Sequence, residues 1–577
     1  MHLRTFWVSA AALLAIVPSG AAQAAADYPA LKVEGAFDNA QTHATSVENP
    51  TAEMPIVVMG GDRKEKENQA IALRHQHKYM TFHVKVSGIA GRAVRFRFGP
   101  FAAGGAQVQT LKTPVVYYDI AHKDFEIVQD VRVERIFLGS REEDRAKADY
   151  WGDVLEFTHR FRQDAAYVAL TFPLTTDDLA AFAKELSTRP GCTVASIGKS
   201  RLDALPIWQI VVTDPNVPDA GKKGVWLYAG EDPWEFPGNI ACLGAARWAA
   251  SEDPLASEFR KGFILSCVPI VHPDCVRRGQ TNYALDNEYK DFLNFSRSWG
   301  RTDIPEMDAV RAAVRKWKEA GRPLDYSESM HSSLSWGCMI RQDYGDGNEG
   351  KRFVEAVIGK KFMPWFGYQT AGKQYADLAE KTGFVAFLKT VYPGALGMIS
   401  HTEQILLLGD KAPGFDLPPF PAWEKKTWTD EDSRNMRGRM IPMQWEDIEA
   451  WGAYRMLALM EFYGKKIDPA RVPAQLICGL LDGYATKAGA KRTFSVVYRD
   501  VEGRAPKGVK LFLADGTEKE MTRSAGNSPL YAIRFEASIV VAKGRKYDFH
   551  FTADNGTAQV RYPRQGKFPG PYAAEDK

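Results

Sequence analysis

The chain has 577 residues, of which 45% are hydrophobic, 25% charged and 12% aromatic, and its formal net charge is +3. This composition is typical of a globular protein, and the length predicts about three or four domains. So small a net charge gives no reason to expect a nucleic acid or an anionic membrane surface as a partner.

Residues 1–26 are typical of a secretory signal. A weakly basic start is followed by an apolar run over residues 6–17 and by small residues over 21–26. The run is too short to span a bilayer, and we predict cleavage around residues 24–26. No later stretch is long and apolar enough for an integral membrane segment, so we expect a periplasmic or secreted protein. In such a compartment the six cysteines could form at most one or two disulfides, or stay as buried thiols.

Residues 27–195 are predicted to form an N-terminal β-sandwich. Apolar and polar residues alternate in the strand-like segments 79–86 and 93–99, and further strand-like segments occur at 115–120, 155–161 and 165–173. The pattern changes at 175–186, where the apolar spacing predicts a helix capped by Thr175 or Thr176.

Residues 196–466 are predicted to form an α/β domain with a mixed or parallel sheet. Nearly unbroken apolar strands are expected at 206–214, 225–230, 263–271, 324–331 and 395–404, with helices at 239–250, 306–320 and 445–463. Strands of this kind are buried on both faces of their sheet. A ligand site in such a sheet is expected beyond the carboxyl ends of the strands.

Residues 467–566 return to short strands separated by turn signals, which predicts a second, smaller β-sandwich of the immunoglobulin-like type. The last residues, 567–577, are expected to be a tail that is disordered after Pro569.

Several chemically useful residues follow the predicted central strands. Asp232 and Glu235 come just after the strand at 225–229, where two carboxylates can converge on a metal ion. His331 and Glu403 lie at the ends of two later strands. Taken one at a time, each has a plain alternative: a solvated acidic loop for the two carboxylates, a structural histidine and a rim glutamate.

Four segments in the same order resemble the zinc carboxypeptidase family, and more closely its cytosolic-carboxypeptidase-like branch, which has a β-sandwich ahead of the peptidase domain. The segment 225–238, VWLYAGEDPWEFPG, matches the strand and loop of the first ligands, normally H-P-G-E. The segment 268–279, VPIVHPDCVRRG, resembles V-P-x-x-N-P-D-G-V. NFSRSWG at 294–300 resembles D-L-N-R-x-W, and SMHS at 329–332 stands where the family has D-L-H-x.

The resemblance implies roles for particular residues. Glu235 and His331 match the second and third zinc ligands, and Asp232 stands at the first, where the family usually has histidine. Glu403 matches the catalytic glutamate, and Arg297 matches the arginine that binds the terminal carboxylate of the substrate.

Neighbouring positions depart from the family pattern. Ser296 replaces the usual asparagine beside Arg297, and Asn282 stands where the oxyanion arginine falls, so that role is vacant unless Arg277 or Arg278 fills it.

The family resemblance implies a zinc ion as cofactor. Asp is an acceptable zinc ligand, but replacing a neutral histidine by Asp232 adds a negative charge to the site. This change should weaken the Lewis acidity of the ion and raise the pKa of bound water. It also makes the ligand set harder, so Mn²⁺ or another divalent ion is an alternative to Zn²⁺.

The sequence therefore predicts an exported metallocarboxypeptidase that hydrolyses a C-terminal amide bond, with Glu403 as general base and a peptide or peptidoglycan-type substrate. Two alternatives stay open. The departures at Asp232, Ser296, Asn282 and Cys275 are also typical of a degraded fold kept as a binding or scaffold protein. The second alternative, indicated by Trp234, is a hydrolase of carbohydrate-linked amides or esters. Neither the substrate nor the oligomeric state follows from the sequence.

Overall fold

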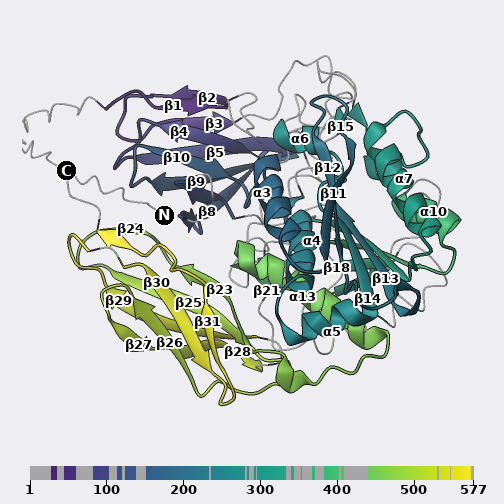
Figure 1. The fold of residues 1–577 in the computed structure, drawn as a ribbon. Helices are drawn as coiled ribbons and strands as arrows, with labels where there is room; N and C mark the ends of the chain where they lie inside the picture. Colours follow the sequence, from purple (N-terminus) through teal and green to yellow (C-terminus); the bar gives the residue numbers. More distant parts are fainter. Residues whose placement is uncertain are drawn as a thin grey trace, which may run out of the picture.

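The computed structural model describes residues 28–35, 45–59, 82–102, 113–119, 124–137, 151–232, 235–279, 283–284, 292–293, 295–332, 339–342, 353, 367–370, 383–401, 405–407, 440–528, 530, 532–545 and 547–573. Figure 1 shows an N-terminal β region, a central sheet with helices on its two faces, and a C-terminal β region. The predicted fold class, an α/β domain flanked by β-sandwiches, is confirmed. Within these ranges no helix combines the length and hydrophobicity needed to cross a membrane.

The N-terminal region consists of two five-stranded sheets that pack face to face. One has the order β1-β4-β10-β6-β7 and the other β2-β3-β5-β9-β8. Alternate residues of β5 (Ala93–Ala102), among them Val94 and Phe96, are buried between the sheets, as the period-two pattern predicted. The other strands are β1 (Lys32–Glu34), β2 (Thr45–Glu48), β3 (Ile56–Met59), β4 (His83–Ser87), β6 (Val115–Tyr117), β7 (Phe125–Ile127), β8 (Val131–Phe137), β9 (Trp151–Arg160) and β10 (Ala165–Ala169).

Helix α3 (Thr176–Ser187) connects this region to the central sheet. Thr175 is the N-cap, and it forms a capping box with Asp178, so one of the two predicted caps is confirmed. The predicted apolar face is also correct, because Leu179, Phe182 and Leu186 are buried.

The central sheet has eight strands in the order β11-β12-β14-β13-β17-β20-β18-β19. Neighbours β14, β13, β17 and β20 run parallel, as do β18 and β19. The pairs β11–β12, β12–β14 and β18–β20 are antiparallel, so the sheet is mixed. β11 begins at Cys192 and crosses the domain boundary that we expected at residue 195. The strands are β11 (Cys192–Lys199), β12 (Pro206–Val212), β13 (Lys223–Ala229), β14 (Phe263–Val268), β17 (Tyr326–His331), β18 (Met339–Gln342), β19 (Gly367–Thr370) and β20 (Leu396–His401).

Helices cover both faces of this sheet (Figure 1). Val225 and Leu227 of β13 belong to the core beside α4 and α13, whereas Trp226 and Tyr228 belong to the core beside α7 and α10. Both faces of β13 are therefore apolar, which is why its sequence is an unbroken apolar run. The helices are α4 (Phe236–Ala249), α5 (Pro254–Gly262), α6 (Pro273–Arg277), α7 (Pro305–Glu319), α10 (Phe384–Val391) and α13 (Trp445–Phe462).

Helices α4 and α13 approach each other closely at glycines. A Cβ atom added to Gly452 of α13 would lie 2.0 Å from the backbone oxygen of Ala241 in α4. The side chain of any other residue would push the two helices apart, so the glycine permits their close packing over the sheet.

The C-terminal region is a sandwich of two four-stranded sheets, with the orders β23-β25-β29-β28 and β27-β26-β30-β31. Part of the expected disordered tail is ordered, because β32 (Tyr572–Ala573) pairs with β24 (Ala485–Thr486). The strands are β23 (Gln475–Leu481), β25 (Lys491–Arg499), β26 (Gly508–Leu513), β27 (Glu518–Glu520), β28 (Thr522–Ser528), β29 (Ala532–Val540), β30 (Phe549–Asp554) and β31 (Gln559–Tyr562).

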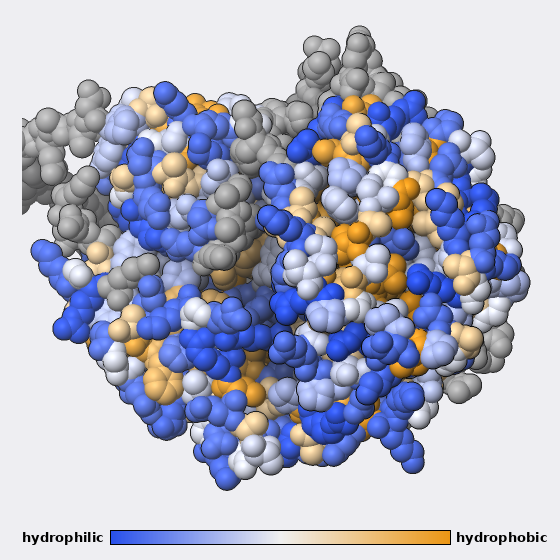
Figure 2. All heavy atoms as spheres, in the orientation of Figure 1, coloured by the Kyte–Doolittle hydropathy of each residue, from blue (hydrophilic) through white to orange (hydrophobic). Residues whose placement is uncertain are grey.

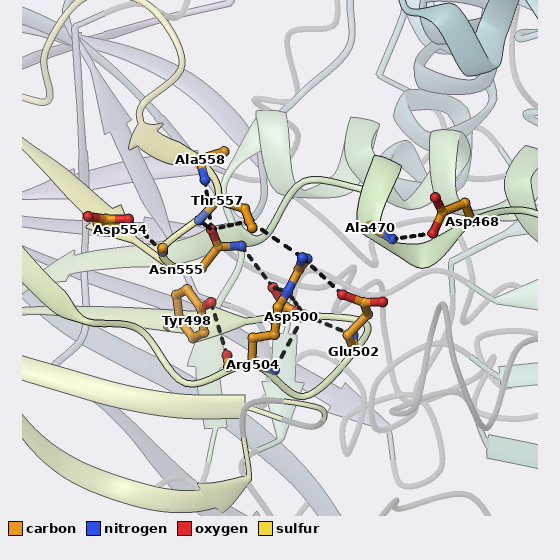
Figure 3. Close-up of polar contacts among 11 residues, drawn as sticks. Asp468, Ala470, Tyr498, Asp500, Glu502, Arg504, Asp554, Asn555, Thr557 and Ala558 are labelled. Atoms are coloured by element: carbon orange, nitrogen blue, oxygen red, sulfur yellow. Dashed lines mark hydrogen bonds and ion pairs between the residues drawn. The ribbon is translucent and has the colours of Figure 1, made fainter.

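A buried carboxylate braces one end of this sandwich (Figure 3). Asp500 follows β25 and accepts hydrogen bonds from Arg504 Nε at 2.9 Å and from Asn555 Nδ2 at 3.1 Å. Asn555 in turn accepts from the backbone amides of Thr557 and Ala558. These contacts provide the Asp500 carboxylate with hydrogen-bond donors from within the protein. We therefore interpret Asp500, Arg504 and Asn555 as a structural link between two loops.

In the described part of the chain the cysteines at 192, 242, 267, 275 and 478 are thiols, and Cys338 lies outside it. Of the two alternatives left open, thiols rather than disulfides are therefore found for these five. The molecular face drawn in Figure 2 is mostly hydrophilic, with small apolar groups scattered over it.

The first turn of α13 joins the central region to the C-terminal sandwich through Asp447. Its Oδ2 accepts hydrogen bonds from Gln444 N at 2.8 Å, Cys478 N at 3.0 Å and Tyr562 Oη at 2.8 Å. Its Oδ1 is buried without a partner among the described residues. Burial raises the pKa of Asp447 to about 6.

We expect an Asp447→Asn variant to respond differently to pH. Because the folded pKa lies above the ordinary value of 3.8, the Asp447 carboxyl favours folding most below about pH 4, and this contribution is lost as the pH rises through about 6. The stability of the variant relative to the wild type should therefore rise by roughly 3 kcal/mol between these pH values and stay level above them. Urea unfolding from pH 4 to 8 measures this difference, and a constant difference across the range would contradict the prediction.

Candidate functional site

The candidate site lies where two neighbouring strands of the central sheet end. β13 pairs with β17 in parallel, with Ala229 opposite Met330, so the carboxyl ends of both strands meet at one edge. Glu235 occupies the N-cap position of α4, which follows β13, and His331 is the last residue of β17. Residues that are 96 positions apart in the sequence thereby come into hydrogen-bond contact.

The first turn of α4 packs tightly against the end of β17. A Cβ atom added to Gly238 would lie 2.6 Å from the backbone oxygen of Met330. The backbone amide of Ser332 donates a hydrogen bond to Glu235 Oε2 at 3.0 Å. This close approach holds the Glu235 carboxylate against His331.

Asp232, Glu235 and His331 form a group that could hold a metal ion, since one ligand atom from each lies within 4.8 Å of the others. His331 Nδ1 is 2.7 Å from Glu235 Oε2 and 3.5 Å from Asp232 Oδ2. Glu235 and His331 are buried, whereas Asp232 is partly exposed. One imidazole nitrogen and two carboxylates suit zinc, and they leave further coordination positions for water or substrate.

The electrostatics of the group favour a cation. Burial, with repulsion from Asp232, raises the pKa of Glu235 to about 7, although His331 opposes this shift. Burial alone would lower the pKa of His331, but the carboxylates of Glu235, Asp232 and Glu231 raise it well above its usual range. Three acidic side chains thus surround one imidazole, and a divalent ion would compensate their charge. The residues present therefore fit the metal that the sequence resemblance implies.

Three residues at this site were not predicted from the sequence. The buried Glu231 carboxylate accepts hydrogen bonds from Trp299 Nε1 at 2.6 Å and Ser329 Oγ at 2.8 Å, and its Oε2 lies 2.9 Å from His331 Nε2. The available signals were weak: Glu231 directly precedes Asp232, and Ser329 shares a strand face with His331 two residues later.

The two arginines of the segment 268–279 have different surroundings. Arg278 Nε donates to Asp203 Oδ2 at 2.9 Å, and a second guanidinium nitrogen contacts Asp203 Oδ1, so this guanidinium is already engaged in an ion pair. Arg277, half-buried at the end of α6, keeps the oxyanion assignment as a hypothesis.

The His-Pro-Asp turn of that segment has a structural use here. Asp274 is buried and accepts hydrogen bonds from the backbone amides of Leu202 at 2.6 Å and Asp203 at 3.1 Å. It therefore holds the loop that presents Asp203 to Arg278.

The remaining predicted residues are only partly described. Ser296 is half-buried in the short helix η5 (Phe295–Arg297), which also contains the backbone of Arg297. Asn282, Glu403, Trp234 and the side chain of Arg297 lie outside the described residues. The roles expected for them stay predictions.

Comparison with solved structures identifies the class of fold. The chain matches a metallo-carboxypeptidase from Burkholderia cenocepacia with a TM-score of 0.51 at 17% identity, over 75% of this chain and 99% of the other. It matches a Burkholderia mallei protein assigned as a carboxypeptidase with a TM-score of 0.53 at 18% identity, over 75% of this chain and 96% of the other. The fold is therefore that of the metallocarboxypeptidases.

Sequence comparison points to the same family. The chain is 22% identical over 238 residues to cytosolic carboxypeptidase 2 of Macaca fascicularis, covering 39% of this chain but 28% of that protein. No family model matches the chain. Fold and sequence similarity together confirm the resemblance to the zinc carboxypeptidases, a family of hydrolases, that the motifs indicated.

Proposed function

We propose that the protein is a metal-dependent carboxypeptidase that removes the C-terminal residue of a peptide substrate. The observation that carries this proposal is the convergence of Asp232, Glu235 and His331 at the carboxyl edge of a metallocarboxypeptidase-like sheet. Catalytic groups of α/β sheets gather at this edge because successive parallel strands all end there.

The roles of the residues follow from their chemistry. Asp232, Glu235 and His331 would hold a divalent ion, which when bound supplies Lewis acidity and lowers the pKa of a water molecule. Glu403 accepts the proton of the attacking water and delivers it to the leaving amine. Arg297 binds the free carboxylate of the substrate in a bidentate manner, which restricts cleavage to the last residue.

We propose Zn²⁺ as the metal, with Mn²⁺ as the principal alternative. Two carboxylates and one imidazole form a harder ligand set than one carboxylate and two imidazoles. With Asp232 at the first ligand position, this site is therefore expected to favour ions that prefer oxygen donors. This preference should be stronger than at the usual family site.

The proposal extends to the substrate and the location of the protein. A site that binds a terminal carboxylate accepts linear peptides, and peptidoglycan stem peptides share that chemistry. Residues 1–26 are typical of a secretory signal and lie outside the described residues, so export to the periplasm or the medium is part of the proposal.

The metal content of the purified protein tests this function. We expect about one equivalent of zinc or manganese per chain by elemental analysis, and an Asp232→Ala variant should lose it. Asp219→Ala is a matched control: the Asp219 side chain is 33% exposed, against 22% for Asp232, and it lies before rather than after β13.

Metal content together with cleavage assays separates the alternatives. A wild-type protein without metal, even after reconstitution with both ions, would contradict the proposal and favour a binding protein built on a degraded peptidase fold. A metal-loaded protein that cleaves sugar-linked amides or esters but no peptide would favour the carbohydrate alternative.

A further inference from the structure

The Glu231 carboxylate lies on the opposite side of the His331 ring from the candidate metal ligands. Glu235 Oε2 is 2.7 Å from His331 Nδ1, whereas Glu231 Oε2 is 2.9 Å from His331 Nε2. The two nitrogens of an imidazole point in different directions, so a group that contacts Nε2 faces away from an ion bound at Nδ1. Glu231 is accordingly absent from the described group of potential ligands.

The surroundings of Glu231 hold its carboxylate in place. Trp299 Nε1 donates to Oε1 at 2.6 Å, and Ser329 Oγ donates to Oε2 at 2.8 Å. Trp299 is buried among Tyr228 and Phe384, and Ser329 lies within β17. Only 3% of Glu231 is exposed, so its orientation is set by rigid parts of the fold.

The contacts around Nε2 of His331 favour a proton on that nitrogen. Ser329 has one hydroxyl proton, which it donates to Glu231 Oε2, and its oxygen also lies 2.8 Å from His331 Nε2. Glu231 Oε2 and Ser329 Oγ therefore both offer Nε2 an acceptor, which favours a proton on Nε2. Nδ1 faces the carboxylates of Glu235 and Asp232, so a divalent ion held there would replace the proton on Nδ1 and leave the contact between Nε2 and Glu231 in place.

We propose that Glu231 is a positioning residue that prepares His331 to bind the metal through Nδ1. This inference rests on the proposed function. Carboxylates that accept a hydrogen bond from the second nitrogen of a ligating histidine fix its tautomer and orientation and increase its basicity. Their replacement typically weakens metal binding about 10- to 100-fold.

Glu231→Gln is the test variant because it keeps the size of the side chain. Glutamine has one acceptor oxygen, whereas Glu231 has two. One of the two carboxylate positions must therefore be taken by the amide nitrogen, which would face the donor of Trp299 or the donors of Ser329 and His331. The variant thus loses both the negative charge and one set of hydrogen bonds.

Zn²⁺ affinity, measured by competition with a chelator, is the readout. We expect Glu231→Gln to bind Zn²⁺ about 10- to 100-fold more weakly than the wild type. Glu306→Gln is the matched control: Glu306 is also buried, but it accepts from the backbone amide of Arg201, and this variant should bind Zn²⁺ like the wild type. The unfolding temperature of each metal-free protein shows whether a loss of affinity comes from a loss of folding.

The outcomes separate the two proposals. If Glu231→Gln binds Zn²⁺ as tightly as a wild type that binds it well, the inference about Glu231 is wrong and the proposed function is unaffected. If the wild type binds neither Zn²⁺ nor Mn²⁺, the proposed function fails and this inference with it.

If the Glu231→Gln variant does not fold, a measurement on the wild type tests the proposal about Glu231. The ¹⁵N chemical shifts of the His331 ring in the Zn²⁺-loaded protein distinguish the two nitrogens. Coordination through Nδ1 with a proton on Nε2 is expected, and coordination through Nε2 would overturn the inference.

Discussion

Replacing Arg455 with alanine is expected to destabilise the protein by about 3–5 kcal/mol, because it leaves the Glu328 carboxylate buried without its partner. Arg455 lies on α13 and Glu328 on β17, and their side chains form an ion pair with no exposed surface. Tyr326 Oη donates to Glu328 Oε2 at 2.8 Å, and Arg455 Nη1 donates to Ser400 Oγ at 2.9 Å. This pair ties the helix to the strand that ends in His331.

Urea unfolding of matched variants measures this effect. Arg471→Ala removes an arginine from an exposed pair, with Glu258 at 2.9 Å, and should change the free energy of unfolding by no more than about 1 kcal/mol. The double variant Glu328→Leu/Arg455→Met should be more stable than Arg455→Ala, because no unpaired charge is left inside. Equal losses for Arg455→Ala and Arg471→Ala would show that the buried pair contributes no more than a surface pair.

Strands and helices with a regular pattern were predictable from the sequence alone. Helix α7 buries Met307, Val310, Val314 and Trp317, as its spacing predicted, because a single core contacts one face of the helix. The apolar run of β13 likewise predicted burial on both faces.

Other elements had no such pattern. β23 was not predicted as a strand: the register of its pairing shifts between Ile477 and Leu480, and Cys478 has φ = +53°, so the alternation that identifies a strand is broken. β18 and β19 are short, and among the described strands β19 lies at the edge of the sheet beside β18.

The candidate metal ligands were predictable from the sequence, whereas the contacts that support them were not. Asp232, Glu235 and His331 could be proposed because their spacing follows the strand ends and a family motif. The role of Glu231 depends on Ser329 and Trp299, which are 98 and 68 residues away in the sequence. Contacts of this kind exist only once the sheet has formed, so no local pattern identifies them.

Glu403→Gln is expected to reduce turnover of a peptide substrate about 10²- to 10⁴-fold, the range that general acid–base catalysis contributes. Glu403 lies outside the described residues, but it follows His401, the last residue of β20, by two positions. His401 is paired with His331 in the parallel register of β17 and β20, so both strands end at the same edge of the sheet. The general base of the proposed function is therefore expected at this point of the chain.

The contrast with Asp232→Ala makes this prediction specific. Glutamine at position 403 has the size of glutamate but cannot accept the proton of an attacking water, and it replaces none of the three candidate ligands. The variant should therefore keep its metal while it loses turnover, whereas Asp232→Ala should lose both. Unchanged turnover with bound metal would exclude Glu403 as the base, and a joint loss of metal and turnover would instead place Glu403 among the groups that hold the ion.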